Sequence, residues 1–397
     1  MIMNRVVLGL FISVLLLLPF SRLSELPILI LAVIGIHGLY SNWSELKYSR
    51  KFRILSIVFS CYFVLIMVSA IDSYWFNKTI GVGIASIRFY LATISLILYF
   101  KFNHRSLLLK IIAAIILFWT FDAIFQYFVG VDLIGRSSYT GRLNGIFGEH
   151  HVKLGPVLAL FMPIVMIALN KQHSIIRWFS IMVLILTIIL SGSRSAWIMM
   201  LFVLLTYWFH HVKHRRFLLL FKSAIIASVM VVCLWFTSSD FQQRIERSLT
   251  VFKGTQSGID FALANRLPIW LASFEMIQQH PVNGVGAHAF RKAYPQFASV
   301  DDVWLQQGGS ALHAHHWVLE IATETGIIGL ILLGFAIYKL FRFVSNSNKE
   351  HYIWAFWIAI LSAFLPITST FSLFASFWSI CIWLCGAGLI MVSKGDD

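Results

Sequence analysis

Five residues that could take part in acid–base chemistry cluster near the predicted start of one apolar helix. They are three histidines and two glutamates: His313, His315, His316, Glu320 and Glu324. Polar groups at the edge of a membrane helix are costly unless they are paired or functional. Imidazole titrates near neutrality, so one of these histidines could act as a general base toward a hydroxyl group. A histidine cluster without chemistry is the alternative interpretation.

We predict no metal ion at this cluster. The residue one turn after His315 is Leu319, which cannot bind a metal. On a helix, His313 and His315 would point roughly 200° apart and could not share one ion. Elsewhere, Asp301 and Asp302 are adjacent rather than spaced as a metal-binding pair, and we expect them in a solvated loop.

A second polar motif is Ser191-Gly192-Ser193-Arg194-Ser195-Ala196-Trp197, between two apolar runs. The tight turn would leave Arg194 at the membrane surface. The serines and the backbone N–H groups at the start of the following helix would form a small anion-binding corner. Arginine suits a pyrophosphate because its planar guanidinium donates two hydrogen bonds at once. A snorkelling arginine in a tight hairpin is the alternative.

A third polar segment, 141–153, is rich in glycine and carries Arg142 and Lys153. It could help to hold phosphate, and a flexible loop is an equally good interpretation.

The longest polar segment contains a predicted amphipathic helix. From 263 to 277, apolar residues recur at helical spacing, with Arg266 at the first turn. Such a helix could lie in the membrane interface. His280-Pro281 should end it. Gly284-Val285-Gly286 predicts a turn rather than a phosphate loop, because no strand precedes it.

These motifs must be positioned by apolar helices. Hydrophobic residues make up 59% of the chain and charged residues 12%, about half the charged share of a soluble domain. The apolar runs have the length that crosses a roughly 30 Å hydrocarbon core. We expect an all-α polytopic membrane protein of about twelve transmembrane helices: 6–20, 26–40, 54–72, 80–100, 107–129, 154–169, 175–190, 195–210, 217–236, 314–341, 352–369 and 371–393.

The loop charges predict the orientation of these helices. Every even-numbered exit is short and basic, which the positive-inside rule assigns to the cytoplasm. Both termini should therefore be cytoplasmic, and the long segments 130–153 and 237–313 should lie outside. We expect three parts: helices 1–9 in 1–236, an outer helical loop in 237–313, and helices 10–12 in 314–397.

The net charge of +14 is not only a cytoplasmic excess, because the outer loops also carry many cations, among them Arg291. An anionic ligand such as a phosphorylated lipid fits this excess, and contact with lipid headgroups is the alternative. A nucleic-acid partner is excluded on that face. The four cysteines lie in apolar spans and should serve packing alone. Arg88 and Asp122, inside two spans, should pair with each other.

Taken together, these motifs resemble those of the O-antigen ligase and O-antigen polymerase superfamily. The resemblance rests on three segments: Ser-Gly-Ser-Arg194-Ser-Ala-Trp, Arg266 followed by Trp270 and His-Pro-x-x-Gly-x-Gly, and His315-His316-x-x-Leu-Glu-x-x-x-Glu324-x-Gly-x-x-Gly329. The length and the large outer loop before the histidines are most similar to the ligase branch.

The resemblance implies a GT-C-like glycosyltransferase with a large periplasmic helical loop in the bacterial inner membrane. It would transfer a glycan from undecaprenyl pyrophosphate to lipid A–core oligosaccharide at the periplasmic face. Arg194 and Arg266 match the arginines that bind the pyrophosphate, and His315 matches the catalytic histidine. His316 stands where asparagine is usual. We expect five further residues to help bind the substrates: Arg142, Lys153, His313, His316 and Arg291.

The resemblance also implies a reaction without metal or cofactor. The first outer loop is short, with Glu25 as its only acid, and the chain contains no Asp-x-Asp. Arginines would then replace the metal, and direct displacement would invert the anomeric centre. An O-antigen polymerase and a protein O-oligosaccharyltransferase are alternatives within the superfamily. A transporter or flippase for lipid-linked sugar is an alternative of another class.

Overall fold

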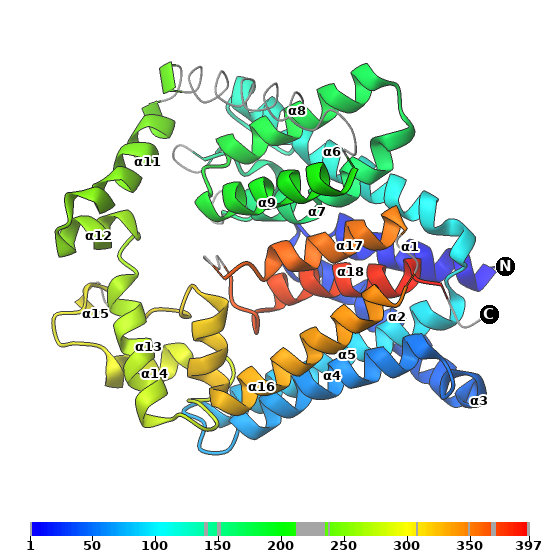
Figure 1. Cartoon of the computed structure of the whole chain (residues 1–397), viewed down its shortest axis with the longest axis horizontal. Helices are drawn as coiled ribbons and strands as arrows, with labels where there is room; N and C mark the ends of the chain where they lie inside the picture. The colour runs from blue at the N-terminus through cyan, green and yellow to red at the C-terminus, as the bar shows by residue number, and fades with distance from the viewer. Residues whose placement is uncertain are drawn as a thin grey trace. The chain divides into compact units, whose positions relative to one another are not determined.

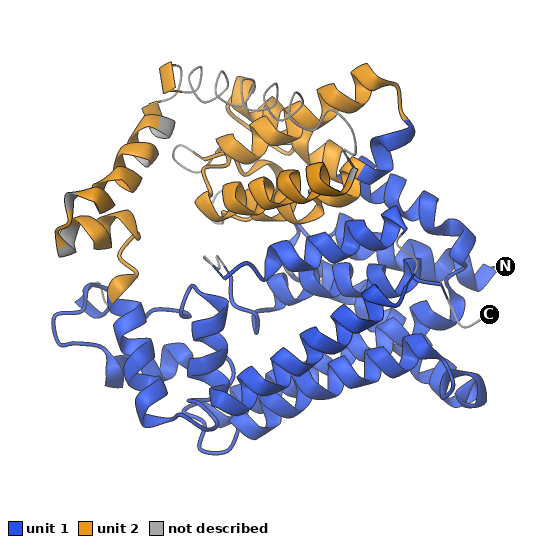
Figure 2. Cartoon of the chain, in the orientation of Figure 1, with its two compact units in different colours: residues 1–115, 167–171, 268–397 blue, residues 116–166, 172–267 orange. Residues whose placement is uncertain are grey.

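The computed structural model describes residues 2–138, 142–148, 152–211, 235–236, 239–306, 309–347, 350–366 and 371–394. In these residues every regular element is helical, apart from one isolated bridge between Val131 and Ser137. The chain forms two compact units (Figure 2). Unit 1 comprises residues 1–115, 167–171 and 268–397, and unit 2 comprises 116–166 and 172–267.

Unit 1 contains most of the long helices (Figure 1). Its helices are α1 (Ile2–Leu16), α2 (Glu25–Ser41), α3 (Trp43–Leu46), α4 (Arg50–Ser69), α5 (Phe76–Tyr99), nearly all of α13 (Leu267–Gln279), α14 (Phe290–Phe297), α15 (Val303–Gln306), α16 (Trp317–Ser345), α17 (His351–Ala363) and α18 (Ser376–Val392). Helix α6 (Arg105–Val129) begins in unit 1 and ends in unit 2. Unit 2 adds α7 (Leu154–Ala168), α8 (Ser174–Leu190), α9 (Arg194–His211), α11 (Ser239–Leu249) and α12 (Gln256–Ala262).

Helix length and composition confirm a polytopic membrane protein. Six helical segments of the described chain are long and apolar enough to cross a membrane: Arg22–Ser41, Arg50–Ser69, Phe76–Tyr99, Phe102–Val129, Leu154–Lys171 and Trp317–Ser345. Helices α1, α8, α17 and α18 are apolar but shorter. The predicted span 217–236 lies almost entirely outside the described residues. The total of twelve spans therefore stays a prediction.

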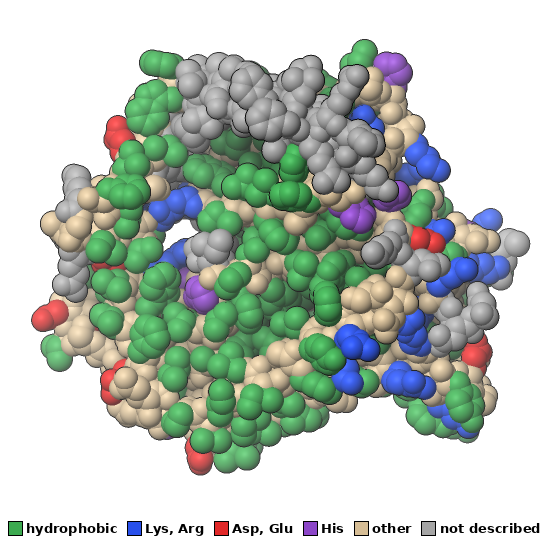
Figure 3. Space-filling model, in the orientation of Figure 1, with side chains coloured by type: hydrophobic (Ala, Val, Ile, Leu, Met, Phe, Trp, Pro, Cys, Tyr) green, Lys and Arg blue, Asp and Glu red, His purple; other side chains and the backbone are tan. Residues whose placement is uncertain are grey.

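Three contacts gather the predicted cytoplasmic loops at one end of unit 1. Arg50, at the start of α4, donates a hydrogen bond to the carbonyl of Phe343 near the end of α16. Arg105, at the start of α6, forms an ion pair with Glu350 before α17. Asn4 in α1 bonds the ring of His104. Lysine and arginine side chains cluster at this end, whereas the outward faces of α4 and α16 are mainly hydrophobic (Figure 3).

The opposite end of unit 1 contains the predicted outer loops. The backbone N–H of Tyr74, between α4 and α5, donates to the carbonyl of Val285. Glu25, at the start of α2, forms an ion pair with Arg88 and accepts a hydrogen bond from Ser376 at the start of α18. The alternation of loops between two ends, as predicted from their charges, is therefore present in this unit.

The pairing predicted between Arg88 and Asp122 is wrong. Arg88 forms its ion pair with Glu25 at 2.7 Å. Asp122 lies in the other unit, where its carboxylate accepts hydrogen bonds from the backbone N–H groups of Leu133 and Ile146. Unpaired N–H groups in a turn stabilise a buried carboxylate as an opposite charge would. Sequence distance gave no information on either partner.

Helix α16 is broken at Gly326, which has φ +62° and ψ −162°. The break frees backbone groups that the segment after α13 then satisfies. The N–H groups of Val285 and Gly286 donate to the carbonyls of Thr323 and Glu324, at 2.9 and 3.0 Å. In return, the N–H of Ile327 donates to the carbonyl of Pro281 at 2.9 Å. Buried backbone groups need such partners. Segment 281–287 is therefore packed against the break in α16 and supplies its hydrogen bonds.

The predicted glycine turn is confirmed, and its glycines also allow this close approach. Gly284 has φ +70°, and a Cβ there would lie 2.4 Å from the carbonyl carbon of Glu324. Gly286 has φ +103°, and a Cβ there would lie 1.9 Å from Oγ of Ser73. Neither position tolerates a side chain without a backbone shift.

Candidate active site

Unit 2 contains the first group of predicted site residues. Arg194 is the first residue of α9, after the turn at Gly192 (φ +65°). Its guanidinium donates to the carbonyl of Ala262, the last residue of α12, and to Oγ of Ser248 at 3.3 Å. The hairpin packs tightly against α7, because a Cβ on Gly155 would lie 2.1 Å from Oγ of Ser191. Arg194 is therefore held beside α11 and α12 rather than free at a surface.

Arg247, in α11, belongs to the same group. Its Nε donates to the carbonyl of Phe261 at 2.7 Å, and its guanidinium lies 4.4 Å from the centre of the Phe261 ring. Arg247 was one of many outer cations in the sequence, and no motif distinguished it. The only signal would have been its place on a strongly amphipathic helix of 11 residues.

Arg266 completes the group and is substantially buried. Burial, followed by the charges of Arg194 and Arg247, lowers its pKa to about 10. It follows two non-glycine residues with left-handed backbone, Ala264 (φ +59°) and Asn265 (φ +58°). Such strained positions are found preferentially at functional sites. Asp260 supports the turn, because its carboxylate accepts the N–H of Leu267 at 3.1 Å.

The third predicted segment also reaches this group. Arg142 lies close enough to Arg194 for its charge to act on that guanidinium. Two side chains of α6 hold the segment: Asp122 accepts the N–H of Ile146 at 2.6 Å, and Oε1 of Gln126 accepts the N–H groups of Asn144 and Gly145. Because residues 144–146 are bonded to α6 in this way, the described part of the segment, 142–148, is a turn held by that helix. Lys153 lies just before α7, partly buried.

Three arginines of unit 2, Arg194, Arg247 and Arg266, lie outside the ion pairs of the described residues. The ion pairs of the described residues are Arg88–Glu25 and Arg105–Glu350, neither of which includes Arg194, Arg247 or Arg266. Three close cations without a carboxylate repel each other, and a multivalent anion relieves that repulsion. We name Arg142, Arg194, Arg247 and Arg266 the arginine cluster. Its chemistry fits a diphosphate.

The histidines lie in unit 1, and the prediction that they share a helix is wrong. Helix α16 begins at Trp317, so His313 and His315 precede it. Nδ1 of His313 accepts the N–H of His315 at 3.2 Å, and the two ring centres are 4.0 Å apart. His315 has φ +54°, an uncommon backbone that turns the chain sharply. The rings therefore face each other instead of pointing apart.

His316 has a structural role as the N-cap of α16. Its Nδ1 accepts the N–H of Leu319 at 3.5 Å, and its Nε2 lies 2.8 Å from the carbonyl of Pro366. A carbonyl only accepts, so Nε2 carries the proton and both ring nitrogens are used. Asparagine is a preferred N-cap residue, which explains how His316 can stand at a position where the resembling family has asparagine.

Helix α13 supports the histidine segment. Nε1 of Trp270, on the first turn of α13, donates to the carbonyl of Ala314 at 3.1 Å. The chain passes from Arg266 directly into this helix, which begins at Leu267 and ends at Gln279, just before His280-Pro281, as predicted.

The two glutamates of α16 hold neighbouring loops rather than face the histidines. The carboxylate of Glu324 accepts the N–H groups of His288 and Phe290, at 2.7 and 3.1 Å, and so caps α14. Oε2 of Glu320 accepts the N–H of Leu373 at 3.0 Å. Both side chains are fully buried, with exposures of 1% and 0%.

Asp302 and Arg291 are two further residues considered in the sequence. Asp302 is buried, not solvated: it accepts hydrogen bonds from the hydroxyl of Tyr294 and the N–H of Trp304. Burial, and then the bond to Asp302, raise the pKa of Tyr294. Arg291 lies in α14, and its Nε is buried without a hydrogen-bond partner among the described atoms.

The described residues do not form a metal-binding site of protein side chains. They contain no group of three histidine, cysteine or acidic side chains that could hold an ion. Glu25, the acid of the first outer loop, is occupied by Arg88. Of the cysteines, Cys61, Cys381 and Cys385 are buried, while Cys233 lies outside the described residues.

Fold and site define a class: a polytopic, all-helical membrane protein with a cationic cluster suited to a diphosphate and a histidine segment before a broken helix. Residues 179–334 match the family described as O-Antigen ligase. This segment, which includes Arg194, Arg266 and His315, belongs to the O-antigen ligase superfamily, as its motifs predicted. No curated protein matches the chain.

Proposed function

We propose that this protein is an O-antigen ligase, which transfers a glycan from undecaprenyl pyrophosphate to lipid A–core oligosaccharide. The observation that carries the proposal is the arginine cluster, in which Arg194, Arg247 and Arg266 lie close together and form no ion pair with a described carboxylate. These three arginines fall within the segment that matches the family, together with the histidines. A lipid-linked diphosphate supplies the missing negative charge.

In the proposed reaction, His315 removes the proton from the attacking hydroxyl of the acceptor sugar. The oxygen attacks the anomeric carbon, and the bond to undecaprenyl pyrophosphate breaks on the opposite side, with inversion. General-base assistance is worth about 10² to 10⁴ in rate. Arg194 and Arg266 stabilise the charge that develops on the leaving diphosphate, typically by a few kcal/mol. No metal takes part.

His315 is preferred to its neighbours because of their contacts. His316 uses both ring nitrogens to cap α16 and to bond Pro366. His313 is buried, with 8% exposure, and its Nδ1 already accepts the N–H of His315. The His315 side chain is partly exposed. We assign His313, His316, Arg142, Lys153 and Arg291 to positioning the segments or contacting the substrates.

The proposed location is the inner membrane, with both termini in the cytoplasm and the site at the periplasmic face. The basic loops at one end of unit 1 support this orientation, because short basic loops are retained in the cytoplasm. Segment 268–316 contacts the loop at the other end of unit 1, where the N–H of Tyr74 donates to the carbonyl of Val285.

Reconstitution of the whole chain with purified donor and acceptor tests the proposal. We expect transfer in the presence of excess chelator. The His315→Ala variant should bind the donor normally but lose transfer. A strict magnesium requirement would contradict the metal-free mechanism, and full transfer by His315→Ala would contradict the assigned base.

The acceptor distinguishes the alternatives within the superfamily. In a deletion strain, free lipid-linked long chains would indicate a ligase, and single repeats on the core would indicate a polymerase. Loss of glycan from proteins alone would indicate a protein O-oligosaccharyltransferase.

The break in α16 is a feature that transporters also have, since their helices are often discontinuous. In transporters, however, unwound backbone lines the substrate cavity, whereas here segment 281–287 satisfies it. This contact favours a structural break over a transport site.

A further inference from the structure

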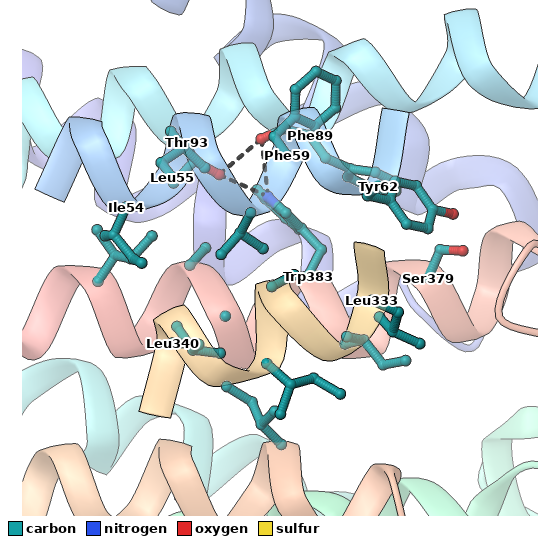
Figure 4. A pocket seen from close by; sticks show the side chains of 18 of the residues that line it. Ile54, Leu55, Phe59, Tyr62, Phe89, Thr93, Leu333, Leu340, Ser379 and Trp383 are labelled. Atoms are coloured by element: carbon teal, nitrogen blue, oxygen red, sulfur yellow. Dashed lines mark hydrogen bonds between the residues drawn. The ribbon is translucent and has the colours of Figure 1, made fainter. Parts of the chain in front are cut away.

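Unit 1 contains a cavity that the proposed reaction does not use. It has a volume of about 260 Å³ and lies among α4, α5, α16, α17 and α18 (Figure 4). Its walls are formed mainly by aliphatic and aromatic side chains, and no lysine, arginine, aspartate or glutamate lines it.

The few hydroxyl groups of the wall are already bonded within the protein. Oγ1 of Thr93 donates to the carbonyl of Phe89 and lies 2.9 Å from Nε1 of Trp383. Oγ of Ser379 donates to the carbonyls of Leu373 and Ala375. Water needs two to four polar partners to stay in a cavity, so this one is not hydrated. Because the cavity is partly open to its surroundings, an apolar molecule can enter it and restore the packing contacts of its walls.

The size and direction of the cavity fit an extended hydrocarbon chain. An engineered apolar cavity of about 150 Å³ already holds benzene. In Figure 4 the side chains of Tyr62 and Ser379 lie at one end, and those of Ile54 and Leu340 at the other. Ile54 and Tyr62 are separated by two turns of α4, roughly 12 Å along the axis. The cavity therefore runs along the helices.

The surrounding helices indicate the source of such a chain. Three of the five wall helices, α4, α5 and α16, have the length and composition to cross a membrane, so hydrocarbon chains surround this unit. A lipid diphosphate would bring several negative charges to the end at Tyr62, where Arg88, whose charge reaches Tyr62, is already paired with Glu25. A zwitterionic phospholipid brings no net charge and is present at high concentration, which favours occupancy by mass action.

We propose that this cavity binds one acyl chain of a zwitterionic phospholipid. The polar head lies toward Tyr62 and Ser379, next to Leu373, whose carbonyl accepts a hydrogen bond from Ser379. The chain just after α17 bonds the histidine segment, through the carbonyls of Leu365 and Pro366. The bound lipid thus completes the packing of unit 1 beside the site.

Photolabelling of the full chain in nanodiscs tests this proposal. The probe is phosphatidylethanolamine with a diazirine at the middle of one acyl chain, and adducts are mapped by mass spectrometry. Gly386 lines the cavity, and a Cβ there would meet no described atom within 4 Å, so Gly386→Leu fills the cavity without a clash. Gly334→Leu is the matched control, because Gly334 is exposed on α16 and also meets nothing within 4 Å.

We expect adducts on wall residues such as Leu333 and Trp383 in the wild type and in Gly334→Leu, and loss of most of them in Gly386→Leu. Ala336→Leu, which narrows the cavity from α16, should act in the same direction. Equal labelling of the wall in all variants, or labelling confined to exposed residues such as Ile331, would overturn the proposal. Displacement of the probe by undecaprenyl phosphate would also overturn it, in favour of an isoprenoid chain.

Discussion

Arg194, Arg247 and Arg266 raise one another's free energy, because three guanidinium groups lie close together with no carboxylate from the described chain between them. Each keeps its place through other contacts. Arg194 and Arg247 donate to the last carbonyls of α12, where the negative end of the helix dipole favours a cation. An anionic ligand that binds among the three guanidinium groups would relieve the repulsion that remains.

Arg247 is therefore expected to contribute to donor binding. Arg247→Ala should weaken binding of undecaprenyl pyrophosphate by about 10- to 100-fold, since a charge-assisted hydrogen bond contributes roughly 1.5–3 kcal/mol. Titration of the donor onto purified variants measures this effect. Arg177→Ala, on α8 and outside the cluster, is the control. Unchanged affinity in Arg247→Ala would remove this residue from the site.

The neighbouring histidines should respond differently to the same substitution. His316→Asn should retain most activity, because asparagine is a good N-cap and replaces the bond to Leu319. His315→Asn should lose about 10² to 10⁴ in turnover, since an amide cannot accept a proton. Comparing kcat of the two variants in reconstituted transfer decides which histidine is the base. The reverse order would assign that role to His316.

At this scale, motifs predicted Arg194, Arg266 and the histidines, and the structure confirms that the two arginines lie together. The relation of His313 to His315 was wrong because the helix was expected to begin at 314 instead of Trp317. Because the helix begins three residues later than expected, His313 and His315 precede it and their rings lie together. Arg247 could not be predicted, because its contact with Phe261 joins residues 14 positions apart without a motif.

Among the elements, α16 depends most on distant sequence. Its break at Gly326 is stabilised by segment 281–287, about 40 residues earlier in the chain. The sequence predicted a turn at Gly284-Val285-Gly286 because glycines in that pattern favour one. It could not predict that the turn binds α16, since the partners are backbone carbonyls that any residue provides.

The break itself can be tested with two glycines of the same helix. Gly326→Ala should lower stability by about 1–3 kcal/mol, because alanine is strained at φ +62° and its Cβ would lie 2.2 Å from the carbonyl oxygen of Val282. Gly334→Ala, where a Cβ has open space, should keep or slightly raise stability. Apparent Tm in nanodiscs measures both. A wild-type Tm for Gly326→Ala would show that the break is not required.

His288, the residue that follows segment 281–287, should make folding stability depend on pH. Burial, and then the charges of Lys78 and Arg291, lower its pKa from 6.5 to about 4. The unfolded chain takes up a proton below pH 6.5, and the folded chain does not until about pH 4, so folding stability falls as pH falls through this range.

We expect the decrease in Tm between pH 6.5 and 4 to be smaller in His288→Asn than in the wild type. Asparagine tolerates the left-handed backbone of this position (φ +63°) and carries no titrating group. Identical pH profiles for the two proteins would contradict the role of His288.

For the whole molecule, composition and periodicity predicted a polytopic helical membrane protein, and the structure and the family match agree with that class. Loop charges predicted which loops share an end, and contacts such as Arg105–Glu350 confirm this within unit 1. Hydropathy could not indicate that α6 and α13 pass between two compact units, because apolar spans look alike whichever neighbours they pack against.

The central claim is that one lipid-borne diphosphate meets the arginine cluster and His315 at a single site. An experimental structure of the full chain with bound undecaprenyl pyrophosphate tests it most directly. We predict that Arg194 and Arg266 bond the diphosphate oxygens and that the His315 ring lies roughly 5–10 Å from those guanidinium groups, which leaves room for the acceptor hydroxyl. A diphosphate bound away from both arginines, or a histidine segment on a separate surface, would contradict the account.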